Sequence, residues 1–358
     1  MKSFALWCRS TQENCSTPIG VLMNFNLWAE HTEKNPEVAL DVGVMLLPKP
    51  SESSTTPTVG TYVKGISFYC PFSVDDKSCT DLIDQVDART IGAIFNDQCK
   101  SADSDNKEWK EVTLQNGSPC EEFYFCKCKR TYHDEDSGTT IEIDVPKDVP
   151  QPWPVYFRFR LRGEGIRQLL TISHSKDQLL TSAFSKEEVV DFRFNDYRTL
   201  DDDTVRSKLD ENAKGCVPVD GKIPIHFLLM SHATVDVDSG DVTGLKERRL
   251  LEEEIWDRYA PNWKHEETGI FKKRKNHQPD KSRTSLEEVT AWHWKKTIDK
   301  PSDGYKMYLR LRLHVSNYGT IARYLVILFF ITVVFDSLEQ PLFALCKTIF
   351  NLLIDLVC

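Results

Sequence analysis

The feature that most restricts the fold of this chain is its apolar tail, TIARYLVILFFITVVFDSLEQPLFALCKTIFNLLIDLVC, which follows a long and strongly charged body. Residues 318–335 contain a single charge, that of Arg323. As a helix this stretch would be ~27 Å long, close to the ~30 Å hydrocarbon core of a bilayer. It therefore predicts a transmembrane helix, and a buried core helix is the alternative.

The last segment, residues 342–358, is apolar except for three polar residues spaced four apart, Lys347, Asn351 and Asp355. This spacing places them in one stripe along a helix. A charge held at the bilayer centre costs ~2.5–3.5 kcal/mol, so the stripe needs shelter. The helix could lie flat at the interface as an amphipathic anchor, cross or re-enter the membrane against another helix, or line a pore with other copies.

The charges beside the tail predict its orientation. The loop DSLEQP carries two acids and no base, whereas Arg310 and Arg312 precede the apolar stretch and Arg323 lies near its start, on the other side of the span. The positive-inside rule then leaves residues 1–317 in the cytoplasm, at the inner (cytoplasmic) membrane. Residues 1–30 contain no signal-peptide pattern, which agrees with that location.

A run of four cations, Lys272, Lys273, Arg274 and Lys275, predicts contact with anionic lipid at the membrane surface. A solvated loop is the default alternative for such a run. Nucleic acid is not excluded as a partner, but the net charge of −9 means that any anion site is a local patch.

The order of patterns along the body predicts an α+β fold with a β-rich front half. Residues 38–47, 61–70 and 222–230 are typical of strands, and residues 121–132 and 138–146 of a hairpin. Residues 245–260 have the apolar spacing and i, i+4 charge pairs of a helix. The Pro-rich stretch VPKDVPQPWP suggests a boundary, giving domains 1–150 and 151–317 before the membrane segment 318–358, a helical hairpin.

Two similar stretches, VYFRFRLRG and MYLRLRLHV, alternate apolar side chains with arginines. In a strand this alternation gives one apolar and one cationic face. If the two strands paired, they would gather five arginines, namely Arg158, Arg160, Arg162, Arg310 and Arg312. Such a cluster requires anions, which are either carboxylates of this acidic chain or a phosphate-bearing ligand or protein partner.

The sequence contains no motif that specifies a reaction. It has no G-x-S-x-G, H-E-x-x-H or P-loop pattern, so no catalytic residue and no cofactor are predicted. The spacing of Cys120, Cys126, Cys128 and His133 lacks a CxxC knuckle, and reduced, idle thiols explain it better than zinc.

These observations together predict a membrane-anchored cytosolic sensor–effector, whose body binds a ligand or partner and whose tail acts on the bilayer, with pore formation by a homo-oligomer as one mode. By architecture alone this is similar to bacterial defence effectors that pair a soluble sensing domain with short membrane segments. A membrane-tethered hydrolase or nuclease and a non-enzymatic membrane scaffold are the alternatives.

Overall fold

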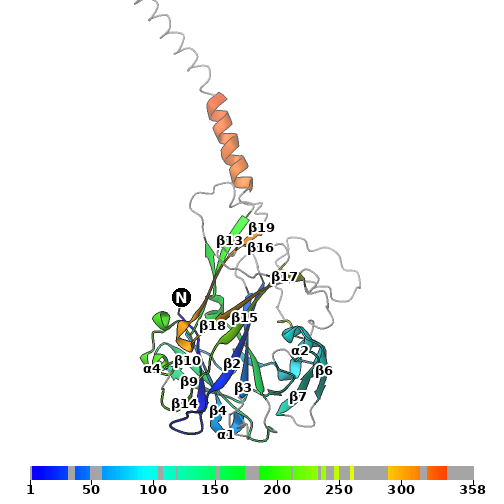
Figure 1. Cartoon of the computed structure of the whole chain (residues 1–358). Coiled ribbons are helices and arrows are strands. Elements are labelled where there is room, and N and C mark those ends of the chain that lie inside the picture. Colours follow the sequence, from blue (N-terminus) through cyan, green and yellow to red (C-terminus); the bar gives the residue numbers. More distant parts are fainter. Residues whose placement is uncertain are drawn as a thin grey trace, which may run out of the picture. The chain divides into compact units, whose positions relative to one another are not determined.

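The protein is described by a computed structural model (Figure 1). The described residues are 2–30, 37–48, 59–103, 108–117, 120–149, 154–173, 185–210, 213–232, 235–238, 246–249, 259–261, 289–314 and 321–336. The chain divides into two compact units, Met1–Ile172 with Glu188–Leu311, and Ser173–Glu187 with Arg312–Cys358. The predicted boundary near residue 150 stays a prediction.

Most of the first unit is built on one ten-stranded sheet, called the large sheet below. Its centre is a long antiparallel hairpin, in which Ile19 pairs with Pro48 and Glu30 pairs with Glu37. Nearly every residue of both strands is buried, as expected for strands covered on both faces. The strand order is β17 (Lys246–Arg249), β18 (Val289–Ile298), β15 (Ile223–His232), β2 (Ile19–Glu30), β3 (Glu37–Pro48), β11 (Val155–Arg162), β8 (Glu122–Cys126), β7 (Trp109–Leu114) and β6 (Cys99–Asp103), with β5 (Cys79–Asp81) paired to β11.

Two smaller sheets accompany the large sheet. The five-stranded sheet has the order β14 (Cys216–Val217), β1 (Ala5–Ser10), β4 (Val63–Cys70), β10 (Gly138–Asp144) and β9 (Arg130–Glu135). The four-stranded sheet has the order β12 (Leu170–Ser173), β13 (Ser185–Phe194), β19 (Tyr305–His314) and β16 (Val235–Asp238). These two sheets supply aromatic residues to the core of the large sheet.

Helices in the described part of the first unit are short. The most regular is α2 (Ala88–Phe95), whose first turn is capped by the Asp87 carboxylate accepting from the Thr90 backbone N–H. It ends at Asn96, which adopts the left-handed conformation. The remaining short helices are α1 (Val59–Tyr62), η1 (Ile83–Gln85), α3 (Glu164–Arg167), η3 (Tyr197–Thr199), α4 (Asp203–Ser207) and η5 (Pro301–Asp303).

One face of the large sheet packs into an aromatic core. Phe159 of β11 meets Phe68 of β4 edge to face at 5.6 Å between ring centroids. Phe25 of β2 meets Phe192 of β13 at 4.8 Å. Because side chains alternate along a strand, placing Phe159 in this core sends Arg158 and Arg160 to the opposite face.

The α+β prediction is wrong, because the described chain is mostly β-sheet with few helices. The clearest local error is at residues 246–249, which form strand β17 rather than the start of the predicted helix. Pairing with β18, in the register of Lys246 with His293 and Arg249 with Thr290, overrides the helical pattern. The strands predicted around residues 38–47, 155–163, 222–230 and 307–315 are confirmed.

The predicted hairpin is confirmed only for the residues next to its turn. β9 and β10 pair antiparallel across a tight turn, with Glu135 opposite Gly138. The stretch predicted as its first strand is divided between two sheets. Residues 122–126 join the large sheet as β8, and residues 130–135 join the five-stranded sheet as β9. The chain therefore changes sheets at residues 127–129.

The predicted transmembrane helix is also wrong. Within the part of the chain that the structure describes, no helix combines the length and apolar character needed to cross a membrane. The polar stripe Lys347, Asn351 and Asp355 and the basic run Lys272–Lys275 lie outside the described residues, and the cytoplasmic location stays a prediction.

The helix at residues 321–336 is apolar around its circumference. Residues 325–335 are all large and apolar except Thr332, and each of these apolar side chains is 44–68% exposed. The Thr332 hydroxyl donates to the Leu328 carbonyl at 3.0 Å, so it adds little polarity to the surface. An exposed apolar surface of this kind marks an interaction surface.

Candidate binding site: a polar band on the large sheet

Polar side chains cross the large sheet in two neighbouring rows on the face opposite the aromatic core. Strand pairing places the residues of each row on β18, β15, β2, β3 and β11 in turn. The first row is Lys295, His226, Asn24, Gly43 and Arg158. The second row is His293, Leu228, Asn26, Asp41 and Arg160. These two rows are called the polar band below.

The end of the polar band on β3 and β11 is fully buried and is called the closed end below. Asp41 lies at its centre. Its two carboxylate oxygens accept from Arg160, Oδ1 from Nε at 2.5 Å and Oδ2 from Nη2 at 3.0 Å. Nη2 of Arg158 lies 3.8 Å from Asp41 Oδ2. All three side chains are at most 1% exposed. Such a fork-to-fork contact is the strong geometry for an arginine and a carboxylate.

Two tyrosines complete the hydrogen bonds of this end. Tyr259 accepts from Arg158 Nε at 2.5 Å and donates to Asp41 Oδ2 at 2.6 Å. Tyr156 accepts from Arg158 Nη1 at 2.8 Å. Burial, the largest cause, raises the pKa of Tyr259, so this group remains a neutral phenol that relays hydrogen bonds.

Aromatic rings enclose the guanidinium groups. Arg160 lies 5.6 Å from the ring centroid of Trp28 and 5.0 Å from that of Tyr259. Trp28 also donates from Nε1 to Asp41 Oδ2 at 2.9 Å. Desolvated cation–π contacts of this kind stabilise a buried cation.

Two asparagines of β2 line the middle of the polar band. With its amide oriented to satisfy its neighbours, Asn26 accepts from Arg158 Nη2 at 2.7 Å and donates to the Phe25 carbonyl at 3.2 Å. Asn24 is 6% exposed, and its Nδ2 has no hydrogen-bond partner among the described residues. A buried donor without an acceptor is costly, which marks the position beside Asn24 as one that favours an acceptor.

Gly43 allows the polar band to pass over β3. A Cβ at this position would lie 2.2 Å from Tyr156 Oη and 3.0 Å from Arg158 Nη1. Only a residue without a side chain leaves room for the hydrogen bond between these two groups. The hydrogen bond between Tyr156 and Arg158 therefore requires a glycine at position 43.

Positive charge exceeds negative charge at the closed end. Arg158 and Arg160 face one described carboxylate, that of Asp41. Burial works to raise the pKa of Asp41, but Arg160 and then Arg158 outweigh it and hold that pKa below its usual value. The pKa of the neighbouring Arg162 is lowered by burial and then by repulsion from Arg160. The described part of the band thus favours a further anion.

The other end of the polar band is more open. His226 and His293 are half-buried, and Lys295 is exposed. Nδ1 of His226 lies 3.1 Å from Nε2 of His293, and the two rings stack with centroids 5.2 Å apart. Burial, then His293 and Lys295, lowers the pKa of His226 to about 4, so this imidazole is neutral at pH 7.

The structure brings together only part of the predicted arginine cluster. Arg158 and Arg160 are buried in the polar band, and the half-buried Arg162 follows them on β11. Arg310 and Arg312 belong to the four-stranded sheet, where both are exposed. The two similar strands therefore do not pair, and their role in binding a ligand stays a prediction.

Sequence reasoning missed Asp41 and Tyr259. Asp41 is a lone acid in the strongly apolar strand VALDVGVMLL, and this contrast is the signal that could have identified a buried ion pair. Tyr259 lies 218 residues from Asp41 in sequence, and no local pattern connects them.

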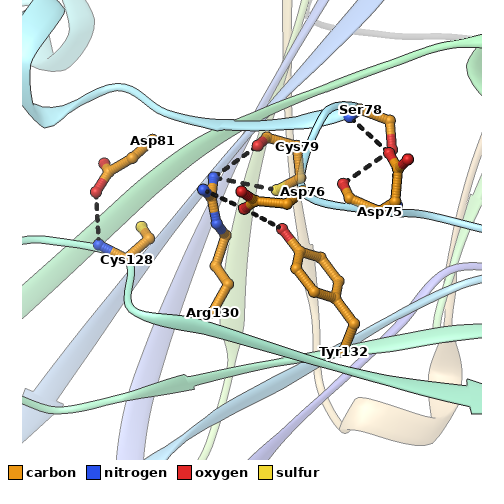
Figure 2. Close-up of polar contacts among 8 residues, drawn as sticks. All are labelled: Asp75, Asp76, Ser78, Cys79, Asp81, Cys128, Arg130 and Tyr132. Carbon is orange, nitrogen blue, oxygen red and sulfur yellow. Dashed lines mark hydrogen bonds and ion pairs between the residues drawn. The ribbon is translucent and has the colours of Figure 1, made fainter.

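A second polar cluster joins β5 to β9 (Figure 2). Arg130 donates from Nη1 to the Cys79 carbonyl at 2.7 Å and from Nη2 to Asp76 Oδ1 at 3.0 Å. Asp81 accepts from the Cys128 backbone N–H at 2.8 Å. Because β5 belongs to the large sheet and β9 to the five-stranded sheet, these contacts hold two sheets together.

The thiols near this second cluster are poorly suited to chemistry. Burial, the largest cause, raises the pKa of Cys79 to about 11 and that of Cys128 well above its usual value. His133 lies instead beside Glu142, with 3.4 Å between Nε2 and Oε2. Among the described residues, no group of three or more His, Cys, Asp or Glu side chains is arranged to hold a metal ion.

No protein-family model and no curated protein sequence matches the chain. Among solved structures, it is similar to native yeast LTA4 hydrolase, with a TM-score of 0.30 and 7% identity over 86% of this chain and 30% of that chain. It is also similar to an M1 zinc metallopeptidase from Deinococcus radiodurans, with a TM-score of 0.21 and 8% identity over 83% and 43% of the two chains. The chain thus spans less than half the length of either structure, and scores this low carry no argument about function.

Proposed function

We propose that the first unit is a ligand-binding module of the sensor type, and that it binds an anionic ligand along the polar band. The observation that supports this function is the charge imbalance at Asp41, where two buried guanidinium groups share one described carboxylate. A buried cation in excess is expensive, so an anion that reaches it gains binding energy from relieving that cost.

The open end of the band is the place where the ligand would enter. Lys295 is exposed there, and Asn24 lies one strand beyond His226 in the same row, with no described acceptor for its Nδ2. Arg158 ends this row on the far side of Gly43. An anion bound near Asn24 would thus have a cation on each side of it.

The chemistry of these donors fits a phosphate or carboxylate group. The Lys295 ammonium and the Asn24 amide N–H would donate hydrogen bonds to the anionic oxygens. The Arg158 guanidinium would attract the anion by its charge, without a direct contact. Each hydrogen bond to a charged group contributes about 1.5–3 kcal/mol, so losing one contact weakens binding by about ten- to a hundredfold.

Calorimetric titration of the full chain with inorganic phosphate, a nucleoside monophosphate and a tricarboxylate tests this function. We expect binding of at least one class, with about tenfold weaker affinity in Asn24→Leu and Lys295→Met. Arg310→Met on the exposed face of β19 is the matched control and should bind normally. If Arg310→Met alone loses binding, the site lies on β19; if no anion binds, the proposed function is wrong.

A further inference from the structure

We propose that His226 and His293 form a two-imidazole site for one divalent first-row transition-metal ion, such as Cu²⁺, Ni²⁺ or Zn²⁺. The pair lies diagonally on the adjacent antiparallel strands β15 and β18, where Leu228 is opposite His293 and His226 is opposite Lys295. Both backbones are held inside the large sheet, so the imidazoles start from a fixed spacing.

The spacing of the facing nitrogens fits a shared ion. Nδ1 of His226 and Nε2 of His293 are 3.1 Å apart. With the metal ~2.0–2.1 Å from each nitrogen, the nitrogen–metal–nitrogen angle would be about 100°, which lies between the square-planar and tetrahedral values. Rotation of the two rings about their broad terminal torsions would turn both lone pairs toward one point.

A metal ion binds neutral imidazole through a ring nitrogen that carries a lone pair. In the hydrogen bond between the two histidines, one of the facing nitrogens carries the proton, because two lone pairs 3.1 Å apart would repel each other. Metal binding therefore moves this proton to the other nitrogen of its own ring, which leaves a lone pair on both facing nitrogens.

The surroundings define what kind of metal site this is. Both rings are half-buried, so an ion would keep open coordination positions for water. Lys295 lowers the affinity for a cation, yet it favours an anion in one of those open positions. With two protein ligands, binding is weaker than at a structural zinc site of four, and imidazole donors disfavour Mg²⁺ and Ca²⁺.

Titration of the full chain with Cu²⁺ and Zn²⁺, each with Mg²⁺ as comparison, tests the site. We expect one Cu²⁺ per chain, an electron paramagnetic resonance spectrum with two equatorial nitrogens, and at least about tenfold weaker binding in His226→Gln and in His293→Gln. His133→Gln, which changes an exposed histidine on β9, should bind as the unmodified protein does.

Three results would overturn the proposal: normal Cu²⁺ affinity in His226→Gln, an equal loss in His133→Gln, or a spectrum without two nitrogen ligands. The spectrum is recorded on unmodified protein, so it decides the question even if a variant fails to fold. Anion titrations in the presence of a chelator test the proposed function separately, because the anion site does not require the metal.

Discussion

Arg160 binds both carboxylate oxygens of Asp41, and that pair is completely enclosed by the large sheet and its covering residues. Arg158 stands beside the pair without a carboxylate of its own among the described residues. The arrangement is therefore asymmetric: removing Asp41 strands two buried cations, whereas removing Arg158 leaves a neutral pair.

Asp41→Asn should be much more destabilising than Arg158→Met. The first change leaves both arginines without a described counter-charge, and we expect a loss of about 3–5 kcal/mol in the free energy of unfolding. The second removes hydrogen bonds to Tyr156, Tyr259 and Asn26 but keeps the Asp41–Arg160 pair, for a loss of about 1–3 kcal/mol. Urea unfolding measures both, and an equal or reversed order would contradict the charge imbalance.

Gly43→Ala should destabilise the protein by about 1–3 kcal/mol, because the new methyl group would collide with Tyr156 Oη and press on Arg158. Tyr156→Phe removes the oxygen involved. The double variant should therefore lose less than the sum of the single variants. Strict additivity in thermal or urea unfolding would show that the collision is not the cause.

His226 should make stability depend on pH between about 4 and 6.5. Its pKa in the folded protein is lowered to about 4, whereas an unfolded histidine titrates near 6.5. The unfolded state therefore binds more protons in this window. The stabilisation is complete above pH 6.5 and is lost as the pH falls toward 4. Urea midpoints across this range should fall less steeply for His226→Phe, and an unchanged slope in this variant would contradict the prediction.

Five cysteines of the first unit should resist alkylation until the protein unfolds. They share complete or nearly complete burial, which is the largest cause of the raised pKa of each thiol; they are Cys8, Cys70, Cys79, Cys126 and Cys128. Mass spectrometry after iodoacetamide treatment at pH 8 should find them unmodified in native protein and modified in 8 M urea. Rapid native labelling of Cys79 would contradict the burial seen beside Arg130.

The apolar helix at residues 321–336 should associate with copies of itself. Because its exposed apolar side chains surround the axis, one partner groove would cover only part of them, and several helices together cover more. Replacing Leu328, Ile331 and Phe335 by glutamine makes one face polar and should lower the mass measured by light scattering. Tyr308→Gln, at an exposed position of β19, is the control. An unchanged monomer in both proteins would refute self-association.

Much of the local structure could be read from alternation and composition. The run VYFRFRLRG has period two, and it forms β11 with phenylalanines in the aromatic core and arginines on the other face. The tight turn before Gly138 likewise follows from its acidic and glycine residues. Residues 246–249 show the limit, because their helical charge spacing was outweighed by pairing with β18.

The sequence by itself determined which face of β11 and of β19 is apolar, since side-chain alternation is a local property of extended backbone. Only the tertiary structure decided that Asp41 is faced by the arginines of β11 and not by the arginines of β19. Strand order and register depend on contacts between residues more than one hundred positions apart, as for Arg160 and Asp41. A local pattern carries no information about such pairings, and burial then turned a predicted cationic face into an enclosed charge cluster.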